Sequence, residues 1–356
     1  MRSYGLSRSA AVATTPVNPR HRLARDELAH CRPYGLSWRT APRTSGYGRS
    51  MKVGFALPVS GSWATPANVA HVAARAEALG YHELWTFQRL LSAVDGSWAP
   101  VYHSVLDPLT TLAYAAAVTR RVRLGVAVVN LPFVAPVLLA KQAATLDVLS
   151  DGRFDLGLGL GWSDEEYEAC GVSKRGQGRR ADEFVGLLRT LWTDTTVAHE
   201  GEFYRVPASR AEPKPVQPGG PPILLGGLSP AALARAGRLA DGWISSSRAD
   251  LTTIGDSVTA VAEAARQAGR DPAALRFVCR GAVKLRDVPG GAGERPPLTG
   301  SIEQLRDDIA VLAARGITEL FLDLNFDPEI GSPQADPVAA LARAETLLEG
   351  LAPSPA

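Results

Sequence analysis

The chain has 356 residues, of which 46% are hydrophobic and 21% charged, and its formal net charge is +2. This balance is typical of a globular protein, and the length fits one large α/β barrel or two ordinary domains. A charge so near zero gives no indication of a nucleic-acid partner, and the absence of eighteen consecutive apolar residues predicts no membrane span. The cysteines Cys31, Cys170 and Cys279 lie far apart, so they predict neither a disulfide framework nor a metal site and suit a reducing cytoplasm.

Residues 1–50 differ in composition from the rest. They hold nine arginines and two acids, a net charge of +7, which leaves +2 − 7 = −5 for the remainder. No apolar segment of a secretory signal is present, and no periodicity predicts a helix or strand. We expect a disordered leader here and a folded domain over residues 51–353. Met51 opens a natural first strand (MKVGFALP), so it is the favoured start of the protein; a functional basic arm is the alternative.

From Met51 onward, short apolar runs alternate with segments of helical character. The predicted strands are residues 52–57, 83–87, 122–129, 151–162, 222–225, 242–245, 275–285 and 318–323. The predicted helices are residues 65–80, 107–120, 136–149, 179–192, 250–268, 301–314 and 337–348, with one more beginning at Ser229-Pro230. A polar insertion at 163–178 and a hairpin within 195–206 interrupt this alternation. Eight strand–helix units predict an α/β fold, a (β/α)8 TIM barrel with insertions.

A doubly wound open sheet is the alternative fold. Its dinucleotide fingerprint requires a glycine turn between an early strand and the following helix. The first strand ends in residues 58–61 (PVSG), which lack that pattern. The glycines of residues 157–161 lie inside a predicted strand, so they do not supply the fingerprint.

The stretch DGRFDLGLGLGW, residues 151–162, alternates leucine with Gly157, Gly159 and Gly161. Period-two alternation predicts a strand, but glycine is a poor strand former. Glycine within a strand marks a close approach by another backbone or by a ligand. We therefore expect an inner barrel strand whose end at Leu160-Gly161-Trp162 touches a flat ligand, or else a tightly packed strand without a ligand.

The active site of such a barrel lies at the carboxyl ends of its strands. Here those ends are mostly apolar, glycine or hydroxyl residues, without metal-ligand spacing or a Gly-x-Ser-x-Gly nucleophile motif. This composition suits a site in which a bound cofactor carries the reaction. Residues 225–230 (LGGLSP) place two glycines before a helix capped by Ser229, a pattern that favours a phosphate or else forms an ordinary tight turn.

Three segments carry a family resemblance: residues 121–162 (RVRLGVAVVNLPFVAPVLLAKQAATLDVLSDGRFDLGLGLGW), 179–192 (RRADEFVGLLRTLW) and 221–243 (PPILLGGLSPAALARAGRLADGW). The chain resembles the luciferase-like monooxygenase superfamily, and most of all its actinobacterial oxidoreductases that use coenzyme F420, a deazaflavin. The resemblance covers Met51 to about Pro353. It implies a (β/α)8 barrel that holds F420, or FMN in sister groups, at the strand ends.

The resemblance also implies the residues that contact the cofactor. In relatives a non-prolyl cis peptide lies behind the ring of the cofactor, and the matching bond here is Ala127-Val128. Gly161 would lie beside the same ring, where a larger side chain would occupy the space that the ring needs. The phosphate site corresponds to Gly226, Gly227 and Ser246. The expected cofactor contacts are Gln88, Ala127, Val128, Leu160, Gly161, Gly226, Gly227 and Ser246, with no metal ligand.

The sequence departs from the family at two places. Deazaflavin sugar-phosphate dehydrogenases have Asp-His where this chain has Gln88-Arg89, and Glu where it has Trp162, so that activity is not carried over. Arg89 is predicted to hold an anionic part of the cofactor or substrate, or else to face solvent. His103 beside Tyr102 is a candidate proton donor, or else a surface residue.

The predicted function is a cytoplasmic oxidoreductase that moves a hydride between F420 and a small organic substrate. One alternative is an FMN-dependent monooxygenase served by a separate reductase, and another is a cofactor-binding protein without catalysis. The resemblance suggests a homodimer. The loops that would select the substrate, residues 88–106, 163–178 and 287–299, carry no recognisable signature.

Overall fold

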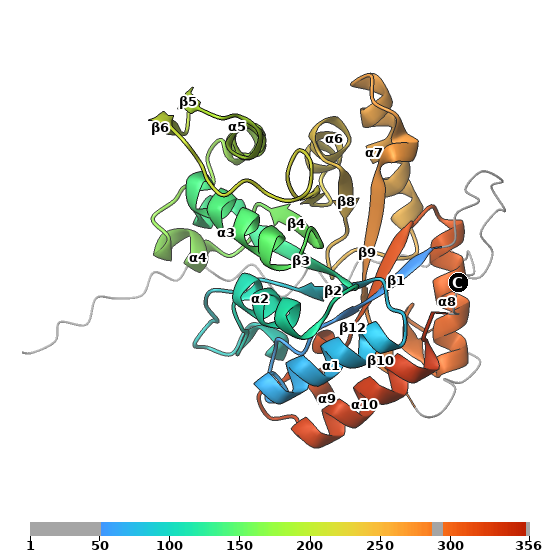
Figure 1. The fold of residues 1–356 in the computed structure, drawn as a ribbon. Coiled ribbons are helices and arrows are strands. Elements are labelled where there is room, and N and C mark those ends of the chain that lie inside the picture. The colour runs from blue at the N-terminus through green and yellow to red at the C-terminus, as the bar shows by residue number, and fades with distance from the viewer. Residues whose placement is uncertain (1–50, 287–294, 354–356) are drawn as a thin grey trace, which may run out of the picture. The chain divides into compact units, whose positions relative to one another are not determined.

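The computed structural model of the protein describes residues 51–286 and 295–353 (Figure 1). The leader predicted for residues 1–50 and most of the loop predicted at 287–299 lie outside the described residues. Within the described part, no helix is long and apolar enough to cross a membrane.

Eight parallel strands form a closed barrel in the order β1-β12-β9-β8-β7-β4-β3-β2. Strand β1 closes the ring because it pairs with both β2 and β12. The predicted (β/α)8 barrel is confirmed, and the doubly wound alternative is wrong. The strands are β1 (Lys52–Ala56), β2 (Glu83–Thr86), β3 (Arg123–Asn130), β4 (Phe154–Gly159), β7 (Ile223–Gly226), β8 (Gly242–Ile244), β9 (Arg276–Ala282) and β12 (Glu319–Asp323).

Helices between the strands cover the outside of the barrel (Figure 1). Ser301 and Gln304 form the predicted capping box. Helix α7 begins later than predicted because Asp250 accepts a hydrogen bond from Thr252 N (2.8 Å) in a preceding turn. The longer helices are α1 (Pro66–Ala78), α2 (Pro108–Val118), α3 (Pro136–Leu149), α5 (Gln177–Thr193), α6 (Pro230–Leu239), α7 (Ile254–Gln267), α8 (Ile302–Ala314) and α10 (Pro337–Gly350).

Smaller elements complete the connections. The predicted hairpin is present as β5 (Val197–Glu200) and β6 (Arg205–Ser209). The polar insertion contains an unpredicted helix, α4 (Asp164–Ala169), capped by Ser163. The strand predicted at 275–285 leaves the barrel after Ala282, and its last residues form β10 (Lys284–Leu285), which pairs with β11 (Thr299–Gly300). A short helix, α9 (Pro328–Gly331), follows β12.

The glycines of β4 are explained by the neighbouring strand. A Cβ on Gly157 would lie 2.0 Å from the carbonyl oxygen of Val126, and one on Gly159 would lie 2.5 Å from Val128 Cγ2. Strand β3 shifts its register on β4 between Val126 and Val129, so the chain between them bulges toward β4. Gly157 therefore marks a close approach by another backbone, one of the two interpretations that the sequence left open, and Gly159 makes room for the side chain of Val128.

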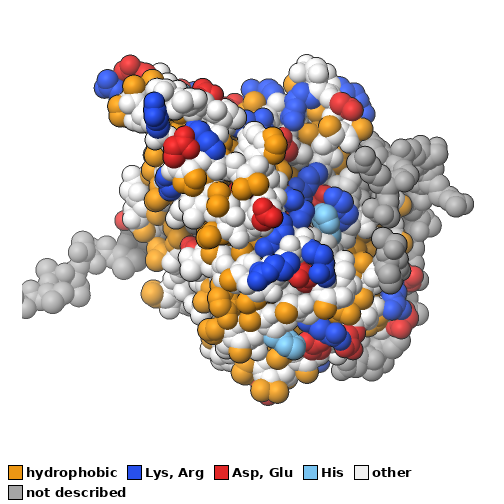
Figure 2. Space-filling view, in the orientation of Figure 1, with side chains coloured by type: hydrophobic (Ala, Val, Ile, Leu, Met, Phe, Trp, Pro, Cys, Tyr) orange, Lys and Arg blue, Asp and Glu red, His pale blue; other side chains and the backbone are white. Residues whose placement is uncertain are grey.

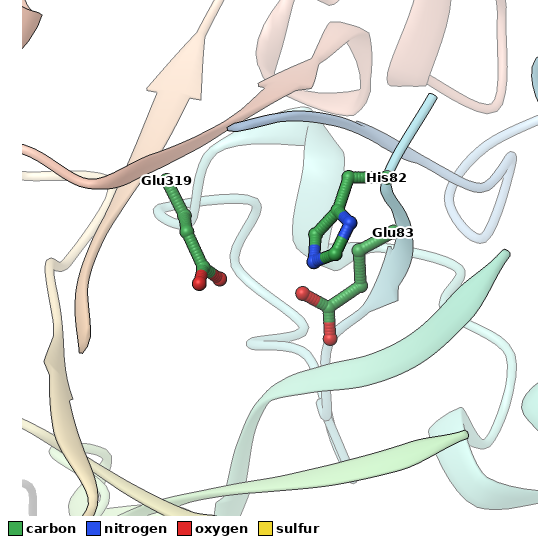
Figure 3. Close-up of side chains that lie close together, drawn as sticks. All are labelled: His82, Glu83 and Glu319. Carbon is green, nitrogen blue, oxygen red and sulfur yellow. The ribbon is translucent and has the colours of Figure 1, made fainter. Parts of the chain in front are cut away.

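The amino-terminal ends of the strands carry a cluster of charged side chains. His82, Glu83 and Glu319 point toward one another, with potential ligand atoms within 4.8 Å (Figure 3). Arg276 forms ion pairs with Glu83 (3.1 Å) and Glu319 (2.6 Å), and also with Asp155 (2.7 Å). Burial and the nearby Asp155 raise the pKa of Glu83 well above its usual value. Because Arg276 already pairs with these carboxylates, the cluster is an internal ion-pair network at the base of the barrel.

Candidate active site

A cavity of about 410 Å³ opens at the carboxyl ends of the barrel strands. All eight predicted cofactor contacts line it, and so does Arg89. His103 is outside the lining, and its Nε2 lies 3.0 Å from the carbonyl oxygen of Trp98. The lining residues are Phe87, Gln88, Arg89, Tyr102, Ala127, Val128, Asn130, Gly159, Leu160, Gly161, Trp162, Gln177, Gly226, Gly227, Leu228, Ser229, Ala232, Ile244, Ser245, Ser246, Ser247, Arg248 and Arg280.

The bulge of β3 forms one wall of this cavity. The peptide bond between Ala127 and Val128 is cis, as the resemblance implied. Arg280 on β9 reaches across the barrel and donates a hydrogen bond from Nη1 to the carbonyl oxygen of Ala127 (3.1 Å). Asp323 on β12 holds that guanidinium through Arg280 Nε (2.8 Å). At the end of β3, Gln88 Oε1 accepts a hydrogen bond from Asn130 N (2.8 Å), so the predicted contact Gln88 also positions this strand.

The loop between β7 and α6 forms the adjoining wall, and a Cβ on Gly226 there would lie 3.4 Å from Val128 Cγ1 of the bulge. Trp243 Nε1 donates to the carbonyl oxygen of Gly227 (2.9 Å) and so fixes the loop against β8. Gly227 has φ +139°, and a Cβ there would lie 2.5 Å from Ala232 Cβ, so this position requires glycine. The backbone N–H groups of Gly227 and Leu228 donate no hydrogen bond to any described residue. Two free donors beside a helix N-terminus can bind an anion.

Ser246, after β8, lies on the same wall as this loop. Its Oγ accepts a hydrogen bond from Arg248 N (3.1 Å), which leaves its own O–H available to donate. Ser229, at the N-terminus of α6, likewise accepts from Ala232 N (3.3 Å), which leaves its O–H available too. The donors available to an anion therefore include the backbone N–H groups of Gly227 and Leu228 and the hydroxyls of Ser246 and Ser229.

Gly161 is required by the fold itself, whether or not a ring lies beside it. Its φ is +74°, and a Cβ would lie 2.9 Å from Phe133 Cζ, so the backbone conformation and this aromatic ring already require glycine. Gly161 still lines the cavity, but the slot of a ring is not needed to explain it.

Arg89 is buried, so the interpretation that it faces solvent is wrong. Its side chain is 5% exposed and lies 3.1 Å from the fully buried carboxylate of Glu166 on α4. Glu166 Oε1 is held by hydrogen bonds from Leu90 N (2.7 Å) and Leu91 N (3.3 Å). Burial lowers the pKa of Arg89 while Glu166 opposes that shift, so the guanidinium stays positively charged at the cavity wall.

The sequence reasoning missed several residues of this wall. Arg280 carried a usable signal, because it interrupts an apolar strand (RFVCRGAV) and a charge inside a barrel strand needs a partner. Glu166 and Arg248 carried no such signal, since each lies in a loop or short helix whose path the sequence does not predict. Trp162 was recognised only as a departure from relatives.

A family model described as "Luciferase-like monooxygenase" matches residues 49–295. The chain belongs to the luciferase-like monooxygenase family. The family resemblance read from the sequence is thereby confirmed. Proteins of this family include oxidoreductases and monooxygenases, so the cavity at the strand ends is the candidate active site.

Relatives in this family use different cofactors. The F420-dependent hydroxymycolic acid dehydrogenase of Mycobacterium tuberculosis is 28% identical, with 86% of this chain and 90% of that protein covered. The oxygenase component of the flavin-dependent trigonelline monooxygenase of Acinetobacter baylyi is 33% identical, with 42% and 40% covered. The chain spans 60% of the length of uncharacterized mycobacterial relatives that it matches at 37% identity.

The solved structure of monooxygenase RslO1 from Streptomyces bottropensis has a similar fold. The TM-score is 0.69 at 25% identity, with 85% of this chain and 98% of that chain covered. The solved structures of an F420-dependent secondary alcohol dehydrogenase and of a riboflavin lyase with modified FMN also share this fold, with TM-scores of 0.66 and 0.67 at 18% and 16% identity.

Proposed function

We propose that the protein is a coenzyme F420-dependent oxidoreductase that transfers a hydride between the deazaflavin and an organic substrate. The observation that carries the proposal is that the β3 bulge and the Gly226-Gly227 loop face one cavity. An apolar wall and free N–H donors are the two features that a flat ring on a phosphate-bearing chain requires. A relative that covers 86% of this chain is F420-dependent.

The residues present fit such a cofactor. Gly227 N, Leu228 N and Ser246 Oγ would hold its phosphate, and Gly226 leaves the approach to them open. Ala127 and Val128 would support one face of the ring, with Leu160 and Gly161 at its edge and Gln88 fixing the end of β3. When bound, reduced deazaflavin supplies the hydride. The chain orients the reactants and excludes water from the cavity.

The alternative is an FMN-dependent monooxygenase with a separate reductase. It is favoured by the trigonelline relative, which is the oxygenase component of a flavin-dependent enzyme. Titration of the purified full chain with F420 and with FMN, each oxidised and reduced, separates the two. We expect F420 to bind, followed by hydride transfer without oxygen. FMN binding with oxygen-dependent turnover, and no F420 binding, would contradict the proposal.

A second alternative is a cofactor-binding protein without catalysis. The replacement of the acid and base of relatives by Trp162 and Gln88-Arg89 motivates it. The protein loaded with reduced F420 should reduce members of an electron-acceptor panel that includes quinones, enones and ketones. Tight cofactor binding with no turnover across that panel would favour this alternative. The candidate proton donor His103 stays a prediction, since its ring faces Trp98.

We also propose a homodimer through α2 and α3. Hydrophobic side chains gather over these helices (Figure 2), among them Tyr114 (43% exposed), Val137 (46%), Leu138 (54%) and Leu149 (63%). Burial of such a surface against a second copy removes it from water. The cytoplasmic location predicted from cysteine usage is not tested by these observations.

A further inference from the structure

Arg89 has hydrogen-bonding groups that its own chain does not satisfy. The side chain is 5% exposed, and one nitrogen, Nη2, lies 3.1 Å from Glu166 Oε2. The other two nitrogens, Nε and Nη1, are buried and have no hydrogen-bond partner in the described part of the chain. An unsatisfied buried donor is unfavourable, and more so on a charged group. Arg89 therefore lacks an acceptor at the wall of the cavity.

Aromatic rings enclose the same guanidinium. Its central carbon lies 4.8 Å from the ring centre of Trp162, 5.2 Å from Tyr102 and 5.5 Å from Trp98. Arg248 approaches Trp162 as well, at 4.5 Å. Trp162 and Tyr102 both line the cavity, so a flat molecule there meets aromatic surface next to two guanidinium groups.

The charged side chains that line the cavity are all positive. Three arginines line it, and no aspartate or glutamate does. Glu166 and Asp323 pair with Arg89 and Arg280 from behind the wall. Arg248 forms no ion pair with a described residue. The cavity therefore presents net positive charge to a ligand.

Arg89 lies away from the proposed phosphate site. Arg89 follows β2 and Ser246 follows β8, and the order β1-β12-β9-β8-β7-β4-β3-β2 separates β2 and β8 by four steps in either direction. They therefore lie on opposite sides of the barrel mouth. One phosphate cannot contact both sides, so Arg89 is left for a second anionic group.

We propose that Arg89, Trp162 and Tyr102 form a substrate subsite for a planar aromatic carboxylate. The carboxylate accepts hydrogen bonds from Arg89, and the aromatic ring packs on Trp162 and Tyr102, with Arg248 adding positive charge at the mouth. The assignment as a substrate subsite rests on the proposed function, since it places this group across the cavity from the cofactor phosphate. The anion-binding property rests on the geometry alone.

The test uses 2-naphthoate and its uncharged analogue 2-naphthamide as probes, titrated calorimetrically into the full chain. We expect naphthoate to bind at least about tenfold more tightly than naphthamide, the effect of a charge-assisted hydrogen bond in a buried site. The double variant Arg89→Met with Glu166→Gln removes both charges, so no unpaired carboxylate stays buried. It should abolish the preference and leave F420 affinity unchanged.

Two further variants keep the test valid if the double variant fails to fold. Arg248→Met, at an exposed position, should reduce the naphthoate preference about two- to fivefold, the size of a partly screened charge. Arg205→Met on the hairpin, also exposed and away from the cavity, is the matched control and should change nothing. Equal affinity for the two probes in the unmodified chain would overturn the subsite.

A loss of F420 affinity in the double variant would also overturn it, because Arg89 would then hold the cofactor. Failure of the proposed function gives a different result. If the unmodified chain binds neither F420 nor FMN but keeps the Arg89-dependent naphthoate preference, the oxidoreductase proposal is refuted and the anion subsite is supported.

Discussion

Substitution of Gly226 by aspartate should weaken cofactor binding strongly without unfolding the protein. A Cβ at this position meets its nearest neighbours at 3.4 Å (Val128 Cγ1), 3.6 Å (Leu158 O) and 3.7 Å (Ile244 Cγ2), which is ordinary van der Waals contact. The backbone there is not left-handed, so a side chain is tolerated. The new carboxylate would face the wall that holds the proposed phosphate.

Two unit charges about 6 Å apart repel by about 3 kcal/mol at an effective dielectric constant near 20. The affinity of the Gly226→Asp variant for F420 should therefore fall about 100-fold. Gly226→Asn has nearly the same shape without the charge and is the matched control. Fluorescence titration measures both affinities, and the thermal midpoints of the apo proteins verify folding. Equal loss in the two variants would refute the electrostatic reasoning, and unchanged affinity in both would refute the phosphate assignment.

Three other predictions concern the fold and assembly. Gly161→Ala should lower the thermal midpoint, because an alanine in the left-handed conformation costs about 1–2 kcal/mol and its Cβ would also clash with Phe133. The control is Gly186→Ala in α5, where a Cβ would meet no atom within 4 Å, and it should not lower the midpoint. An unaltered midpoint for Gly161→Ala would contradict the observed backbone. Leu138→Lys on α3 should convert the dimer into monomers, as measured by sedimentation velocity. Val338→Lys on α10, at a position that is 76% exposed, is the control and should leave the dimer intact. A monomeric unmodified protein would contradict the proposed dimer. Burial raises the pKa of Glu83 well above its ordinary value of 4.5, so its contribution to stability is present below pH 4.5 and is lost as the pH rises through the folded-state pKa. Urea unfolding of Glu83→Gln and the unmodified chain should therefore favour the variant more at pH 8 than at pH 5, and a pH-independent difference would contradict this.

The barrel was predictable because its signals are local. Apolar runs, turn residues and helix caps such as Ser301 with Gln304 are read from a few neighbouring positions, and eight repeats of them leave few topologies. The ends of elements were less predictable where a distant contact decides them. The seventh strand leaves the barrel after Ala282 because its continuation pairs with Thr299–Gly300 instead.

The walls of the site were predictable only in part. The alternating glycines of β4 signalled a close approach, but only the bulge of β3 shows that the neighbours are the Val126 backbone at Gly157 and the Val128 side chain at Gly159. All eight cofactor contacts that the family resemblance implied line the cavity, because the segments that carry the resemblance include the carboxyl ends of barrel strands. The ion pair between Arg89 and Glu166 was not predictable, since it joins residues 77 positions apart through a helix that the sequence did not indicate.

A crystal structure of the full chain soaked with F420 tests the central claim most directly. The account predicts the phosphate at Gly227, Leu228 and Ser246, the ring against Ala127-Val128, and an open space between the ring and Arg89. A phosphate bound at Arg89, or a cofactor outside this cavity, would contradict it.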